Sequence, residues 1–185
     1  MFKQGLVALV LLVCSGRSWA TDGAKLGFLV EGAIEYGGDD VVTVNFKDGS
    51  HQNIKAGQGG TIAAGGYFKP QESSPFSVRG TVGYKFVTTA ASNADIRIDR
   101  IVYELVGNYE WPSGFRVGAG MTRHTGIKLN ADGFGPNVKF ADATGATAEF
   151  GWKWLSLSYT AIDYKDEFGD KWDAGSLGLA LIWRF

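Results

Sequence analysis

The sequence predicts an all-β protein, an eight-stranded antiparallel up-and-down transmembrane β-barrel preceded by an export signal. Apolar and polar residues alternate with a period of two in eight segments, each of about ten residues, which is the length that a tilted membrane strand needs. Short turns and long polar loops alternate between these segments. Aromatic residues gather where the strands meet the short turns, as in the interfacial girdles of membrane barrels.

Residues 1–20 have the pattern of a cleaved secretory signal peptide. Lys3 supplies the positive charge, an apolar run of about ten residues follows, and small residues, Ser18 and Ala20, precede the expected cleavage point. The apolar run is too short to span a bilayer as a helix. We therefore expect residues 21–185 to form the barrel domain. Cys14, the only cysteine, lies in the signal, so no disulfide or thiolate metal site is expected.

The first four strands are predicted at residues 25–36, 61–69, 76–87 and 100–111. Each carries apolar side chains on one parity and charged or small ones on the other, which is the pattern of a strand with two different faces. In chain order the apolar parity carries Leu26, Phe28, Val30, Ile34 and Tyr36; Ile62, Ala64 and Phe68; Phe76, Val78, Val82, Tyr84 and Phe86; and Ile101, Tyr103, Leu105, Tyr109 and Trp111.

The last four strands are predicted at residues 115–124, 144–152, 155–164 and 176–185. Their alternation is of the same kind and is clearest in the final strand. In chain order the apolar parity carries Phe115, Val117, Ala119 and Met121; Ala146, Ala148, Phe150 and Trp152; Leu155, Leu157 and Tyr159; and Leu177, Leu179, Leu181, Trp183 and Phe185.

The connections between these strands are alternately short and long. Short turns are predicted at 70–75, at 112–114 and at Lys153-Trp154, and long loops at 37–60, 88–99, 125–143 and 165–173. Such a chain has its short turns and both termini on one rim and its long loops on the other, which is the plan of outer-membrane barrels. Residues 41–47 are expected to extend a strand beyond the membrane.

Alternation alone does not tell which face of the barrel is outside, because a soluble barrel such as a lipocalin has an apolar interior. Two observations favour a lipid-facing apolar side. The parity opposite to the apolar one is rich in glycine and alanine, which a narrow eight-stranded interior needs between its larger residues. An aromatic girdle surrounds the short-turn rim, formed by Phe68, Phe76, Trp111, Phe115, Trp152, Trp154, Trp183 and Phe185.

The carboxyl-terminal strand resembles the assembly signal of Gram-negative outer-membrane proteins, with Leu179, Leu181, Trp183 and Phe185 alternating to the last residue. The eight-strand plan resembles the small barrels of the OmpA, OmpX and OmpW type. Ile162-Asp163-Tyr164-Lys165 is similar to a segment of OmpW-like proteins. The resemblance implies an integral protein of the outer membrane, delivered by the barrel assembly machinery and surrounded by outer-membrane lipids and lipopolysaccharide.

The polar parity carries many charges that should face the lumen. Buried charges are costly unless they are paired, so we expect salt bridges that fill the barrel, and in particular Glu110 opposite Arg116 across the turn at 112–114. A gate or conduction path is the alternative interpretation. The predicted lumen charge network comprises Glu31, Glu35, Arg79, Lys85, Arg100, Glu104, Glu110, Arg116, His124, Glu149 and Arg184, and we place Lys153 on the same face.

We do not expect catalysis or a cofactor. Lipid A deacylases of the outer membrane use a His and a Ser, but Gly126 stands two residues after His124, and Ser156 and Ser158 are predicted at the opposite rim. The aspartates of the loops lack the spacing of a twelve-residue calcium loop. A formal net charge of −1 gives no reason to expect a nucleic-acid partner.

The function predicted from the sequence is therefore a non-catalytic outer-membrane barrel with a structural or surface-interaction role. A narrow channel for small, including hydrophobic, solutes is the alternative that the OmpW resemblance implies. A lipid A-modifying enzyme is the third. The solute or surface ligand stays open.

Overall fold

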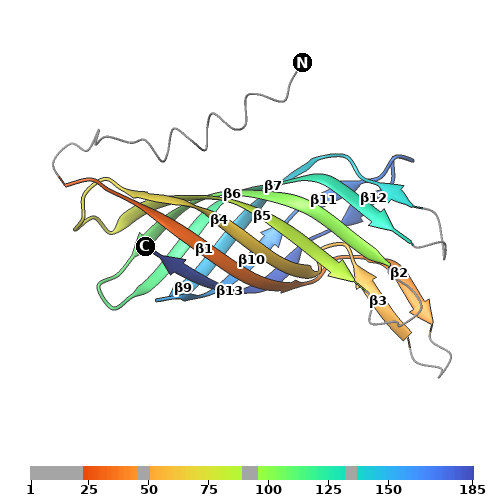
Figure 1. Ribbon diagram of the computed structural model, residues 1–185, viewed down its shortest axis with the longest axis horizontal. Helices are drawn as coiled ribbons and strands as arrows, with labels where there is room; N and C mark the ends of the chain where they lie inside the picture. The colour runs from red at the N-terminus through yellow and green to blue at the C-terminus, as the bar shows by residue number, and fades with distance from the viewer. Residues whose placement is uncertain (1–22, 46–50, 89–95, 132–136) are drawn as a thin grey trace, which may run out of the picture.

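A computed structural model describes residues 23–45, 51–88, 96–131 and 137–185, so the predicted signal peptide lies outside the described residues. Eight strands close into one antiparallel barrel: β1 (Lys25–Tyr36), β4 (Gly59–Lys69), β5 (Phe76–Thr88), β6 (Arg97–Glu110), β7 (Phe115–Asn130), β9 (Ala143–Trp152), β10 (Leu155–Ala161) and β13 (Ser176–Arg184). Each strand pairs with the next, and β13 pairs back with β1. The predicted fold class is confirmed (Figure 1).

In the described part of the chain, no helix has the length and apolar character needed to cross a membrane.

Five short strands extend the barrel at the long-loop end. They are β2 (Asp40–Asn45), β3 (His51–Lys55), β8 (Val138–Lys139), β11 (Asp163–Lys165) and β12 (Lys171–Asp173). The pairs β2–β3 and β11–β12 form hairpins, and β8 pairs with β7. Figure 1 shows both hairpins at one end of the barrel and the carboxyl terminus toward the other. Over its described residues 41–45, the extension expected at 41–47 is thus one arm of the β2–β3 hairpin, and residues 46 and 47 lie outside the described residues.

The wall of the barrel is apolar outside and polar inside. Leu105 on β6 and Val117 on β7 are 60% and 40% exposed, whereas Val106, the neighbour of Leu105 in β6, is fully buried. All eight aromatic residues of the predicted girdle are exposed. Toward the loops the outer wall carries exposed tyrosines, Tyr36, Tyr84, Tyr103 and Tyr159. A soluble barrel has the opposite polarity, so the lipocalin alternative is wrong.

The turn between β9 and β10 has only two residues, as predicted. Trp152 and Leu155 are register partners, and Lys153 adopts a left-handed backbone conformation with φ of 53°. This conformation turns the Lys153 side chain outward, where its Nζ lies 4.7 Å from the centre of the Trp152 ring. The prediction that Lys153 faces the lumen is wrong, because the strand alternation ends at Trp152.

Strand β7 is longer than predicted and continues to Asn130. The register with β6 shifts by one residue, since Ile101 pairs with Thr125 but Asp99 pairs with Lys128. Gly126 lies in this bulge with φ of 62°, a conformation that favours glycine. The extra residue reverses the parity, so Ile127 and Leu129 point into the barrel. The interval 125–143 was therefore wrongly predicted as loop throughout.

The barrel closes at its carboxyl terminus. Phe185 N–H donates to the Phe28 carbonyl at 2.8 Å, and Phe28 N–H donates to the Phe185 carbonyl at 3.3 Å. The two rings lie 6.4 Å apart on the outer wall. The last residue of the chain thus completes the ladder between β13 and β1 at the short-turn rim.

Candidate functional site

The centre of the lumen is occupied by one guanidinium group. Arg79 of β5 donates to Glu31 of β1 at 2.9 Å, to Glu104 of β6 at 3.3 Å and to Glu149 of β9 at 2.7 Å. The Arg79 side chain is only 4% exposed. Because β5 and β9 are separated by β6 and β7 in the ring of strands, the pair of Arg79 and Glu149 crosses the lumen. A planar guanidinium has five donors, which suits this role as a hub.

A second arginine extends the cluster toward the short turns. Arg116 Nε lies 3.5 Å from Glu149 Oε1, and Arg116 Nη1 donates to the carbonyl oxygen of Lys153. Gly151 permits this arrangement, because a Cβ there would lie 2.6 Å from the Arg116 guanidinium carbon. The sequence predicts Arg116 in the lumen but carries no signal for the backbone carbonyl of the β9–β10 turn as one of its partners.

The short-turn rim has a separate ion-pair group. Glu110 and Arg116 are register partners, as predicted. However, the ion pairs of Glu110 are with Arg184 at 3.2 Å and with Lys69 at 3.0 Å. Arg184 comes from the last strand of the chain, so this group links β6, β4 and β13 at the barrel mouth.

On the loop side of the hub lies a group with more cations than carboxylates. Lys85 donates to Glu35 at 2.7 Å, and the same carboxylate accepts hydrogen bonds of 3.0 Å from Thr61 and Ser176. Arg100 is the register partner of Lys85 and is 1% exposed. Its Nη2 donates to the Gln58 carbonyl at 2.9 Å. Its Nε and Nη1 have no hydrogen-bond partner among the described residues.

His124 lies above this group, as predicted, and is buried. Its Nδ1 shares a hydrogen bond with the hydroxyl of Tyr164. Burial raises the pKa of Tyr164 to about 12, so this hydroxyl keeps its proton at neutral pH. The Tyr164 ring also lies 5.7 Å from the Arg100 guanidinium carbon. Ser156, one of the serines considered with His124, pairs with Gly151 beside the β9–β10 turn, at the opposite rim.

An apolar plug closes the loop end of the barrel. It is the group of side chains that packs inside the extended strands above His124, and sequence reasoning missed it. Its signal was the alternation of Ile96 and Ile98, which continues the inward parity of β6. The plug consists of Ile54, Ala56, Val87, Ile96, Ile98, Ile127, Leu129, Phe140, Ala143, Ile162, Tyr164 and Ala174, with Val41, Val42, Val138 and Trp172 packed against it.

The β11–β12 hairpin covers the plug and has a capped turn. Asp166 accepts hydrogen bonds from the backbone N–H groups of Phe168 and Asp170, each at 2.9 Å, and from Trp172 Nε1 at 3.1 Å. Desolvation acts to raise the pKa of this carboxyl, but these hydrogen bonds outweigh it and hold the pKa of Asp166 below its usual range. Phe168 at the turn is 76% exposed.

The two loop-end hairpins are joined to each other. Asp39 N–H donates to the Asp173 carbonyl at 2.8 Å, and Asp173 N–H donates to the Asp39 carboxylate at 2.7 Å. The two hairpins therefore form one connected surface at the loop end.

Within the described ranges, no group of three or more His, Cys, Asp or Glu side chains is arranged to hold a metal ion.

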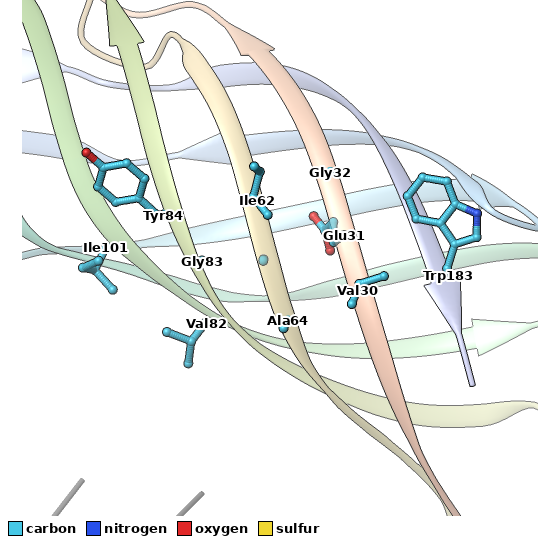
Figure 2. Close-up of a pocket in the computed structure, with 11 residues that line it drawn as sticks. Val30, Glu31, Gly32, Ile62, Ala64, Val82, Gly83, Tyr84, Ile101 and Trp183 are labelled. Atoms are coloured by element: carbon cyan, nitrogen blue, oxygen red, sulfur yellow. The ribbon is translucent and has the colours of Figure 1, made fainter. Parts of the chain in front are cut away.

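The outer wall carries a groove of about 520 Å³ over β1, β4 and β5. Figure 2 shows Val30, Ile62, Val82 and Tyr84 around it, with Trp183 of β13 to one side. Gly32 and Ala64 contribute little side-chain volume at its centre. The groove lies on the opposite side of the wall from the Arg79 hub. We call it the lateral groove.

Comparison with known proteins gives a likeness at the level of the fold. No protein-family model matches the chain, and no curated protein matches it. Among solved structures, the chain is similar to Ail, the attachment invasion locus protein of Yersinia pestis, which was crystallised with the heparin analogue sucrose octasulfate. The identity is 12%, the match covers 89% of this chain and 100% of Ail, and the TM-score is 0.46. The closed barrel with an apolar exterior itself confirms the predicted architecture of a small outer-membrane barrel.

Proposed function

We propose that this chain is a non-catalytic outer-membrane barrel whose lumen is sealed and whose role is structural or to present a surface. The observation that carries the proposal is the filling of the barrel at two levels. Arg79 and its three carboxylates span the lumen at mid-height. The apolar plug fills it at the loop end. A hydrated ion would have to separate both layers in order to cross.

The alternative role, a channel for small solutes, is less compatible with these contacts. Eight strands enclose an interior just wide enough for side chains to fill it. A solute that passed through would separate Arg79 from Glu149, which leaves buried charges unpaired at a cost of several kcal/mol. It would also have to displace the packed side chains between β6, β7 and the β11–β12 hairpin. These costs support a closed barrel over a conducting one.

Conductance in planar bilayers tests the proposal. Wild-type protein, folded and inserted, should show no unitary current steps. The double variant Arg79→Ala, Glu149→Ala opens the mid-lumen layer only and should stay closed, whereas the same variant with Ile98→Ala and Ile127→Ala added also opens the apolar plug and should leak. Regular unitary steps from the wild-type protein, at a level that the double variant does not change, would contradict a sealed lumen.

The surface role is supported by the loop end. The mutual hydrogen bonds of Asp39 and Asp173 join the two hairpins, and the Asp166 cap orders the turn that exposes Phe168. A surface that is already ordered loses little conformational entropy when a partner binds. We propose that this end faces the cell exterior, among the lipopolysaccharide headgroups, and presents a binding surface there.

Delivery to the outer membrane is part of the same proposal. The signal at 1–20 would export the chain, and the terminal residues Leu179, Leu181, Trp183 and Phe185 would be recognised by the barrel assembly machinery. The exposed outward positions of Leu179, Trp183 and Phe185 support this, since they are accessible before the barrel is complete. Deletion of Phe185 should lower the amount of assembled protein in the outer membrane, and unchanged assembly would contradict this part.

A further inference from the structure

The lateral groove arises from small residues on an otherwise bulky outer wall. Gly32 is the register partner of Ile62, and Ala64 lies between Val30 and Val82 in adjacent strands. Ile62 and Val82 are 71% and 52% exposed, so they stand out from the wall on either side. A Cβ at Gly32 would meet no atom within 4 Å. The centre of the groove is thus open space.

The groove follows the height of the apolar belt. Trp183 belongs to the girdle of the short-turn rim, and Tyr84 belongs to the tyrosines of the loop side. Between them the outward side chains are aliphatic, as Figure 2 shows for Val30, Ile62 and Val82. A polar occupant would lose its hydrogen bonds to water without finding replacements there.

We propose that the lateral groove is a binding site for one hydrocarbon chain of a membrane lipid. This inference rests on the proposed placement of the barrel in the membrane. The lining of the groove is mostly apolar and the groove is open on its lipid side, as a site for an acyl chain requires. Association between apolar surfaces inside a bilayer is driven by packing rather than by the hydrophobic effect, so shape decides the preference. A chain that fills the groove gains contacts that a smooth wall does not offer.

A second copy of this chain is a poorer occupant. A two-fold dimer presents the same patch on both subunits. Two concave patches that face each other would enclose a void between them, and atoms that line a void lose their contacts. The single flexible chain fills the groove, whereas the dimer does not.

Filling the groove is the direct test. Gly32→Leu places a side chain into the groove, and its Cβ would meet no atom within 4 Å. Gly107→Leu is the matched control, because Gly107 is a glycine on the exposed outer wall, and a Cβ there would meet only the Ala119 carbonyl at 3.8 Å. Gly107 of β6 does not line the groove. Both variants are first checked for folding by gel mobility before and after boiling.

Native mass spectrometry in detergent, with dipalmitoyl phosphatidylethanolamine as the probe lipid, measures the occupancy. Wild-type protein and Gly107→Leu should each carry one bound lipid at low lipid concentration. Gly32→Leu should lose that lipid, with at least a several-fold weaker apparent affinity, and Ala64→Leu should do the same. Equal lipid binding by Gly32→Leu and Gly107→Leu, or absence of bound lipid in the wild type, would overturn the inference.

The outcomes separate this inference from the proposed function. A dimer in the wild type that Gly32→Leu abolishes would overturn the lipid site and assign the groove to a second copy. A barrel that inserts and does not conduct, but binds lipid without regard to Gly32, would leave the sealed-barrel function intact and refute the groove. Unitary conductance together with Gly32-dependent lipid binding would refute the sealed-barrel function and leave the lipid site in the groove intact.

Discussion

Two buried arginines of the lumen should respond in opposite ways to the same substitution. Arg79→Met and Arg100→Met both replace a buried guanidinium by an apolar side chain that has no charge. Arg79 contacts Glu31, Glu104 and Glu149. Among the described residues no carboxylate lies within ion-pair distance of Arg100, and its Nη2 donates to the Gln58 carbonyl. The two variants therefore compare a paired with an unpaired buried charge.

For Arg79→Met, three carboxylates lose their common partner. Glu149 is 2% exposed and retains only Arg116 at 3.5 Å. Removal of one partner from a buried ion pair costs about 3–5 kcal/mol of unfolding free energy, because the charge that remains is uncompensated. The loss should shrink when the pH is lowered, since protonated carboxyl groups no longer need a counter-charge.

For Arg100→Met, the losses and gains nearly cancel. The variant gives up one charged hydrogen bond, about 1.5–3 kcal/mol, and the contact with the Tyr164 ring, about 1 kcal/mol. It also removes the desolvation penalty of an unpaired buried cation, which is several kcal/mol. The free energy of unfolding should thus stay near the wild-type value or rise.

Urea unfolding in lipid vesicles measures both variants, with gel mobility and tryptophan fluorescence as independent probes. A loss for Arg100→Met as large as that for Arg79→Met would refute the reasoning, because ion pairing would then not distinguish the two positions. Unchanged stability of Arg79→Met at neutral pH would refute it as well.

Three further outcomes are expected. Folded protein should migrate differently from boiled protein on a detergent gel, and equal mobility would argue against a barrel. Leu105→Arg should lower the free energy of unfolding in vesicles by about 2–4 kcal/mol, as expected for an arginine at the bilayer midplane. Ser113→Arg in the short turn should change this free energy little. Equal losses in the two variants would contradict the placement of the apolar belt. Because the pKa of Asp166 is lowered in the folded state, its cap stabilises the β11–β12 turn above the usual carboxyl pKa, and this contribution disappears as the pH falls through the lowered value. The Trp172 Nε1–H resonance should report this titration by NMR, and Asp166→Asn should abolish it.

The strands could be predicted because their signal is local. Leu105 and Val106 lie on opposite faces by alternation alone, and the register across a short turn follows from its length, as for Glu110 and Arg116. Their ionic partners could not be predicted in this way. Glu110 pairs with Arg184, which is distant in the chain, and such contacts depend on how the barrel closes and how far its strands are staggered.

The apolar plug could not be predicted because one residue changes the pattern. The bulge at Gly126 reverses the parity of β7, so the alternation of Ile127 and Leu129 no longer continues that of the residues before it. A segment whose period is broken, and which is rich in glycine and asparagine, is typical of a loop. Two inward isoleucines, Ile96 just before β6 and Ile98 within it, carried the same information, but a strand that extends beyond the membrane was not expected there.

The bulge has a consequence for the order of events during assembly. Above it the barrel is charged outside, with exposed Arg97, Lys128 and Lys139, and apolar inside. If the part of the barrel above the bulge formed before insertion, it would have to carry these charges through hydrocarbon, where each costs about 2–4 kcal/mol at mid-depth. The hairpin tips must therefore cross the bilayer before their apolar faces meet. We expect the plug to pack last, so that the fluorescence of Trp172 reaches its final value after the gel mobility of the membrane barrel does.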